Sequence, residues 1–299
     1  MKKYNHSLVS VNCAGNYFLC LNKKTQKYYL ADQSFNPIKN LELRREKDSI
    51  ALLSPNGEKI AVQDAQGITV YEVEQCSTPL YHLDTTTAYS IAFIDNQSLL
   101  LIQNKNCAIY TFFKIDLLKR EISPFFDLET GILEQYSYSK DCVVFAYENR
   151  QNCKHMILEI SYDGTVLQTI CLDHISRGAY LQSVHFNESC DKFLFVQGRS
   201  LLKSPKLCIC DMDKQTKEKI VTLPRKMRSL YSLIFNFDWL DKSHFYVKYE
   251  TRAEIYCVDS AQPIFTYETK SRDMFPVLFY NEKIYFSDDN AIYEFDWNE

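Results

Sequence analysis

Residues 49–83 read SIALLSPNGEKIAVQDAQGITVYEVEQCSTPLYHL, and this stretch decides the fold of the chain. It holds four runs of strand length, which are SIALLS, KIAVQD, ITVYEVE and PLYHLD. The turns PNGE and AQG and one longer connection separate the runs, and Gly, Pro, Asn and Asp are the residues that bound strands. Apolar stripes at helical spacing are absent. The stretch therefore predicts four antiparallel strands in chain order.

The same order of four runs recurs through the chain. A period of 37–50 residues, measured between the ends of successive third runs (for example 74 − 32 = 42), is typical of a propeller blade. These third runs end at Asp32, Glu74, Asp116, Ser161, Asp211, Asp259 and Asp296. We therefore expect an all-β fold, a seven-bladed β-propeller of four-stranded antiparallel blades within a single domain, residues 1–299. The expected blades are 7–43, 49–84, 89–128, 133–172, 181–223, 231–268, and 275–296 together with 1–6.

The last blade has only three runs at the C-terminal end of the chain. We expect residues 1–6 to pair as its outer strand, which would close the ring and remove an open sheet edge. The inner runs SLLLI, CVVFAY and KFLFV are apolar throughout. This pattern favours sheets that are covered on both faces over sheets with one wet face.

At SPNGEKIAV…ITVYEVE the chain resembles WD-repeat propellers, whose blades often read S-P-D-G-x-x-hydrophobic at the first turn. Residues 208–223, CICDMDKQTKEKIVTL, also resemble the end of such a blade, with Asp211 in the place of the motif's Asp. The family's Gly-His pair and its Trp-Asp pair are missing. The resemblance implies a scaffold for binding more often than a catalyst.

Composition agrees with a soluble globular protein. The 299 residues are 46% hydrophobic and 14% aromatic, and the net charge is −4. The N-terminus lacks the apolar core of a secretory signal, and no run reaches the length of a membrane span. Most of the eleven cysteines lie inside apolar runs, which favours reduced, structural thiols. We expect a cytoplasmic protein.

The order of strands also sorts the loops of a propeller onto two faces. One face, with the first turns and the acids that end the third strands, should be acidic. The other face, with loops such as NKKTQK and GRSLLKSPK and links such as LRREKDS and LPRKMRS, should be basic. Its densest part is expected where blades five and six meet. The candidate partner-binding residues there are Arg199, Lys203, Lys206, Arg225, Lys226 and Arg228.

The basic face has two interpretations. It is a docking site for an acidic protein partner, or it is a solvated loop surface that keeps the protein soluble. Nucleic acid is a weaker candidate, because the chain is acidic overall and its aromatic residues lie mostly in strands. No membrane span is expected, and the oligomeric state stays open.

Residues for catalysis or metal binding give weak patterns. A hairpin at Tyr162–Thr165 would bring Cys153 opposite His174, with His155 on the same face, but a structural role is favoured over zinc. His185 is expected to pack near the central channel. No Gly-rich phosphate loop, nucleophile elbow or HExxH motif is present, so we expect no cofactor, no metal and no catalytic residue.

We therefore expect a non-catalytic interaction scaffold or a subunit of a larger complex. The alternative is a propeller that binds a small molecule or a glycan, or a hydrolase or lyase with its site at the channel mouth.

Overall fold

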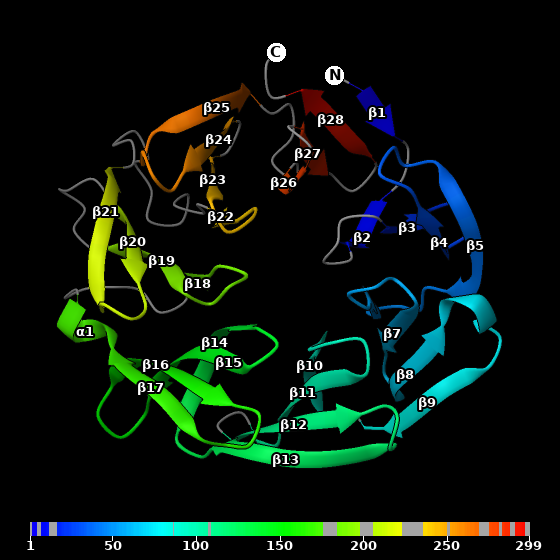
Figure 1. The fold of residues 1–299 in the computed structure, drawn as a ribbon, viewed down its shortest axis with the longest axis horizontal. Coiled ribbons are helices and arrows are strands. Elements are labelled where there is room, and N and C mark those ends of the chain that lie inside the picture. Colours follow the sequence, from blue (N-terminus) through cyan, green and yellow to red (C-terminus); the bar gives the residue numbers. More distant parts are fainter. Residues whose placement is uncertain are drawn as a thin grey trace. The chain divides into compact units, whose positions relative to one another are not determined.

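The computed structural model describes residues 2–4, 7–11, 17–85, 87–106, 109–175, 184–197, 206–222, 236–249, 252–268, 275–280, 283–287 and 291–296. In this part of the chain nearly every regular element is a strand, and the strands form seven four-stranded antiparallel sheets (Figure 1). The architecture is an all-β propeller of four-stranded antiparallel blades, as the sequence predicts. No helix among these residues is long and apolar enough to cross a membrane.

The first three sheets follow the chain in order. The first blade contains β2 (Ser7–Val11), β3 (Phe18–Asn22), β4 (Lys27–Ala31) and β5 (Pro37–Arg44). The second contains β6 (Ile50–Leu53), β7 (Lys59–Gln63), β8 (Gly67–Glu72) and β9 (Pro79–Asp84), with the 3₁₀ helix η1 (Val73–Gln75) after β8. The third contains β10 (Ala88–Phe93), β11 (Ser98–Asn104), β12 (Tyr110–Asp116) and β13 (Glu121–Leu128).

The next three sheets repeat this arrangement. The fourth blade contains β14 (Gly131–Tyr138), β15 (Cys142–Asn149), β16 (Lys154–Ser161) and β17 (Val166–Cys171), followed by α1 (Leu172–Ile175). The fifth contains β18 (His185–Phe186), β19 (Lys192–Gln197), β20 (Lys206–Asp211) and β21 (Thr216–Thr222). The sixth contains β22 (Asn236–Trp239), β23 (His244–Lys248), β24 (Arg252–Cys257) and β25 (Pro263–Glu268).

The remaining sheet joins the two ends of the chain. It contains β26 (Phe275–Tyr280), β27 (Lys283–Ser287), β28 (Ile292–Asp296) and β1 (Lys2–Tyr4), in the order β1-β28-β27-β26. Strand β1 pairs antiparallel with β28, with Lys3 opposite Tyr293. The N-terminal segment therefore forms the outer strand of the last blade, to which the C-terminal end of the chain contributes only three strands.

Apolar side chains on both faces of the inner strands build the core. All but the last residue of β3 and all but the last two of β11 are buried, as sheets covered on both faces require. One cluster packs Leu21 and Leu30 of the first blade against Ile60 of the second. Another packs Val144 of the fourth blade against Phe193 and Cys208 of the fifth. Adjacent sheets thus share their cores, which is how neighbouring blades stabilise each other.

The chain divides into two compact units. One comprises Met1–Asp127, Tyr285–Trp297 and Glu299, and the other comprises Leu128–Ile284 and Asn298. The clusters described above each lie within one unit.

The exact start and end of some strands depend on local turn geometry. Gly67 starts β8 with φ = 150°, and a Cβ atom there would lie 2.1 Å from the Leu83 carbonyl oxygen, so only glycine fits this turn. Three of the expected strand ends lie past the strand. Asp32 follows β4, which ends at Ala31, and Asp259 follows β24, which ends at Cys257. Glu74 lies in η1, because β8 already ends at Glu72.

Candidate interaction surface

Each blade presents two kinds of loops, one at each end of its sheet. We call "turn end" the end with the connections between first and second strands and between third and fourth strands. We call "link end" the end with the connection between second and third strands and the link to the next blade. Antiparallel order alone determines this division within each sheet.

Carboxylates at the turn ends are used to build turns. Asp32 accepts hydrogen bonds from the backbone N–H groups of Ser34 and Asn36, at 2.8 and 2.9 Å. Asp116 accepts two such bonds from Leu118 and Lys119, at 3.0 Å each. The same kind of bond is made by Asp95, Asp163, Asp211 and Asp241. These bonds satisfy donors that would otherwise have no partner where the chain reverses.

The hydrogen bonds stabilise the charged form of these acids. Bonds from the Ser161 hydroxyl and from Thr165 lower the pKa of Asp163 to about 2. The Lys214 ammonium and backbone N–H lower the pKa of Asp211, and the Lys119 N–H lowers the pKa of Asp116. The charges of these particular carboxylates therefore stabilise the turns in which they lie.

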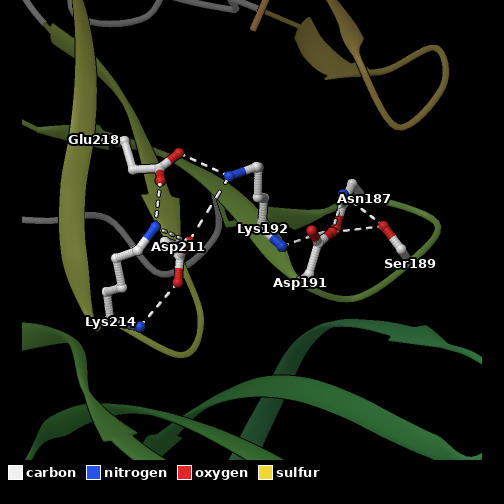
Figure 2. Close-up of polar contacts among 7 residues, drawn as sticks. All are labelled: Asn187, Ser189, Asp191, Lys192, Asp211, Lys214 and Glu218. Carbon is white, nitrogen blue, oxygen red and sulfur yellow. Dashed lines mark hydrogen bonds and ion pairs between the residues drawn. The ribbon is translucent and has the colours of Figure 1, made fainter. Parts of the chain in front are cut away.

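The fifth blade carries the most connected polar cluster at its turn end (Figure 2). Lys192 of β19 bridges to Glu218 of β21 at 2.7 Å, and Lys214 contacts Asp211 at 2.9 Å and Glu218 at 3.1 Å. Two lysines and two acids thus neutralise one another across three strands.

A second set of bonds in Figure 2 holds the β18–β19 turn. Asp191 accepts from the Ser189 hydroxyl at 2.5 Å and from the Asn187 amide at 2.6 Å. Both sets of contacts are made within the fifth blade, so this cluster stabilises that blade.

The predicted partner-binding residues fall mostly outside the described residues. This holds for Arg199, Lys203, Arg225, Lys226 and Arg228. Lys206 is described: it is the exposed first residue of β20, opposite Gln197 and Thr222. Of the six, only Lys206 belongs to the described part of the chain, so their grouping stays a prediction.

Other basic residues at link ends are described, and the side chains of most form no ion pair with a described residue. The side chains of Lys23, Lys24, Lys27, Arg44, Arg45, Lys47, Lys105, Arg150, Lys154 and Lys206 form no ion pair with any described residue. Arg252 is an exception, since it pairs with Glu254 at 2.9 Å and stacks on Tyr249. Sequence reasoning named the loops of the first blade as basic but placed the densest group at the fifth and sixth blades.

The fourth blade contains Cys153, His155 and His174, the residues considered above as zinc ligands. The predicted register is present from Met156, opposite Cys171, to Glu159, and a bulge between Glu159 and Ile160 shifts it by one residue next to the hairpin. However, Cys153 lies in a turn at φ = 53° and His174 lies in α1, so neither extends the ladder. The described residues contain no group of three His, Cys, Asp or Glu side chains placed to hold a metal ion.

The thiols and His185 have structural contacts. Nine cysteines are described and none forms a disulfide, and burial raises the pKa of Cys190 and Cys210 to about 12. His185 is half-buried, with Nδ1 3.2 Å from Asp238 and its ring against Phe237. The backbone oxygen of His185 accepts a bond from Trp239 at 2.9 Å. These contacts join β18 of the fifth blade to β22 of the sixth.

A cavity of about 390 Å³ lies at the turn ends of the first two blades, between Ile38, Lys39, Gly57 and Val73. Four of its polar side chains pair with one another: Lys39 contacts Glu74 at 2.8 Å, and Asn56 donates to Glu58 at 2.6 Å.

Comparisons with known proteins bear on the fold. No family model matches the chain, and no curated protein matches it. Among solved structures, 991 chains match. One belongs to a crystal structure of a eukaryotic initiation factor, with a TM-score of 0.50 and 9% identity, covering 90% of this chain and 78% of that one. At this identity the likeness concerns the fold.

Proposed function

We propose that this chain is a non-catalytic interaction scaffold, or a subunit of a larger complex, that docks an acidic protein partner on its basic link ends. The observation that carries the proposal is the difference between the two ends of the blades. Turn-end carboxylates such as Asp32, Asp116 and Asp211 accept hydrogen bonds from backbone N–H groups, whereas most described link-end cations form no ion pair with a described residue. An exposed charge without a partner can dock without breaking an existing ion pair, so only its dehydration and the ordering of its side chain oppose the contact.

The proposal includes one seven-bladed ring as a single domain, residues 1–299, that resembles WD-repeat propellers. Support comes from the seventh sheet, in which β1 and β28 are partners although they lie at opposite ends of the chain. A ring has no exposed sheet edge at its closure, which protects against edge-to-edge association.

The proposed compartment is the cytoplasm. The nine described cysteines are unpaired, and a reducing compartment preserves such thiols. The likeness to a eukaryotic initiation factor supports the propeller scaffold and identifies no partner.

The test is affinity purification of the tagged full chain from its native host, followed by mass spectrometry at low and at high salt. We expect an acidic protein to be recovered at low salt and reduced at high salt, because salt screens exposed charges. A variant in which Arg225, Lys226 and Arg228 are changed to Gln should recover less of it. Equal recovery by this variant and by the unchanged chain would contradict their role in docking.

A further inference from the structure

We propose that the link end of the first blade is a docking site for an extended acidic segment of a protein partner. The site, which we call the blade-one basic patch, comprises Lys23, Lys24, Lys27, Arg44, Arg45 and Lys47. This inference rests on the proposed function and adds to it a surface and a partner chemistry.

The β4–β5 register brings two separate basic segments together. Lys27, the first residue of β4, lies directly opposite Arg44, the last residue of β5. The next residue, Arg45, donates its backbone N–H to the Gln26 oxygen at 2.8 Å. The β3–β4 turn and the link to the second blade are thus joined through their backbones. Like charges directly opposite each other destabilise a sheet, so this pairing is unfavourable without a counter-charge.

Hydrogen bonds hold the patch in one shape. The Asn22 side-chain oxygen accepts from the N–H groups of Lys24 and Thr25, at 3.0 and 3.3 Å. The Gln26 amide donates to the Lys23 oxygen at 2.7 Å. In the link, the Ser49 hydroxyl donates to the Glu46 oxygen at 2.9 Å. A backbone ordered in advance loses less entropy when a partner binds.

The charges of the patch are available. None of its six basic side chains makes a hydrogen bond or an ion pair with the described residues, and five of the six residues are exposed, Lys23 being half-buried. Lys39, on the same strand β5 as Arg44, is instead paired with Glu74. Three acids lie among the six cations, at Glu42, Glu46 and Asp48, which leaves a net charge of 6 − 3 = +3.

The chemistry of the patch favours an acidic protein segment over single-stranded nucleic acid. Stacking of bases needs exposed aromatic rings beside the cations. The aromatic residues of β4, Tyr28 and Tyr29, are 1% and 4% exposed, so they belong to the core.

The experiment measures binding of two fluorescein-labelled probes to the full chain by anisotropy. One probe is a poly-glutamate peptide, and the other is an oligouridine of equal charge. The test variant is Lys24→Glu, Lys27→Glu, Arg44→Glu. The matched control is Arg120→Glu, Lys140→Glu, Lys242→Glu, which changes the net charge equally with exposed residues of turn ends that make no ion pair with described residues.

We expect the test variant to bind the peptide about tenfold more weakly, because three exposed charge contacts become repulsive. The control should stay close to the unchanged chain. Equal weakening in both variants overturns the inference, because net charge alone would then explain binding. Tighter binding of oligouridine than of the peptide also overturns it, in favour of a nucleic-acid site. If the test variant shows an altered circular dichroism spectrum, the Gln versions of the same three substitutions replace it.

Purification from the native host separates this inference from the proposed function. Loss of the partner with the Lys24, Lys27 and Arg44 variant supports the patch. Unchanged recovery with this variant, together with loss after the Arg225, Lys226 and Arg228 changes, overturns the patch and leaves the proposed function standing. Unchanged recovery with both variants, at low and high salt alike, contradicts both.

Discussion

The stability that Asp163 and Asp211 contribute to the turns of the fourth and fifth blades depends on pH. Both carboxyls have a pKa below the ordinary value of 3.8, and that of Asp163 is about 2. The folded chain therefore binds fewer protons than the unfolded chain as the pH falls through this range. The stability that each acid contributes is fully present above the ordinary pKa and is lost as the pH falls toward the lower, folded value.

We expect the melting temperature of Asp163→Asn to depend less on pH between 3.8 and about 2 than that of the unchanged chain. Asparagine keeps an oxygen that accepts the Thr165 N–H but does not titrate. Asp213→Asn is the control, because Asp213 is exposed and makes no side-chain bond with described residues. Thermal unfolding followed by circular dichroism at several pH values checks this. Parallel curves for Asp163→Asn and the unchanged chain would show that the turn does not titrate as described.

At the scale of elements, strands of one sheet differ in how much they stabilise the fold. In the fifth blade, Phe193 of β19 is fully buried and packs in the core shared with the fourth blade. Ile220 of β21 is 46% exposed on the outer strand of the same sheet. Inner strands thus hold the blades together, while outer strands tolerate exposed side chains.

Truncation of these two residues should reveal the difference. We expect Phe193→Ala to lower the free energy of unfolding by about 3–5 kcal/mol, because it removes apolar contacts and leaves a cavity. Ile220→Ala should change it by about 0.5 kcal/mol or less. Urea titration measures both values. A comparable loss in the two variants would contradict the difference in their packing.

At the scale of the whole molecule, the pairing of the chain's two ends is the decisive contact. Strand β1 adds three residue pairs to β28, and the Lys3 ammonium lies 5.4 Å from the centre of the Tyr293 ring. Without β1, the edge of β28 would expose unpaired backbone groups.

A variant that lacks residues 1–6 should therefore be less stable by about 1–3 kcal/mol, since each net hydrogen bond contributes about 1 kcal/mol. It should also self-associate more, as measured by light scattering. Lys3→Ser is the control, because it removes only a side chain and keeps the backbone pairing. A truncated chain as stable and as monodisperse as the control would mean that β1 does not protect this edge.

The strands were predictable because their signal is local. Runs such as SLLLI and KFLFV are apolar at every position, and this suffices to predict an inner strand covered on both faces. The error at Glu74 has a local cause as well: the run ITVYEVE looks like one strand, but the chain turns into a 3₁₀ helix after Glu72. Five of the six predicted partner-binding residues lie outside the described residues, so their role stays a prediction.

The blade-one basic patch could not be predicted from local runs, because it depends on how β4 and β5 are aligned with each other. Lys27 and Arg44 are 17 residues apart (44 − 27 = 17), and a bulge between Lys27 and Tyr29 shifts their pairing. Cys153 and His174 show the converse case, where the register was predicted but a turn and a helix end the ladder.

The sequence by itself determined the all-β class, the four-strand rhythm and the two kinds of loop ends, since all three follow from the alternation of apolar runs and turn residues. Only the tertiary structure decided which charged side chains form hydrogen bonds or ion pairs with other described residues and which do not. Hydrogen bonds and ion pairs form between residues that bulges and turn geometry bring within about 3 Å of each other, and no local pattern encodes such distances.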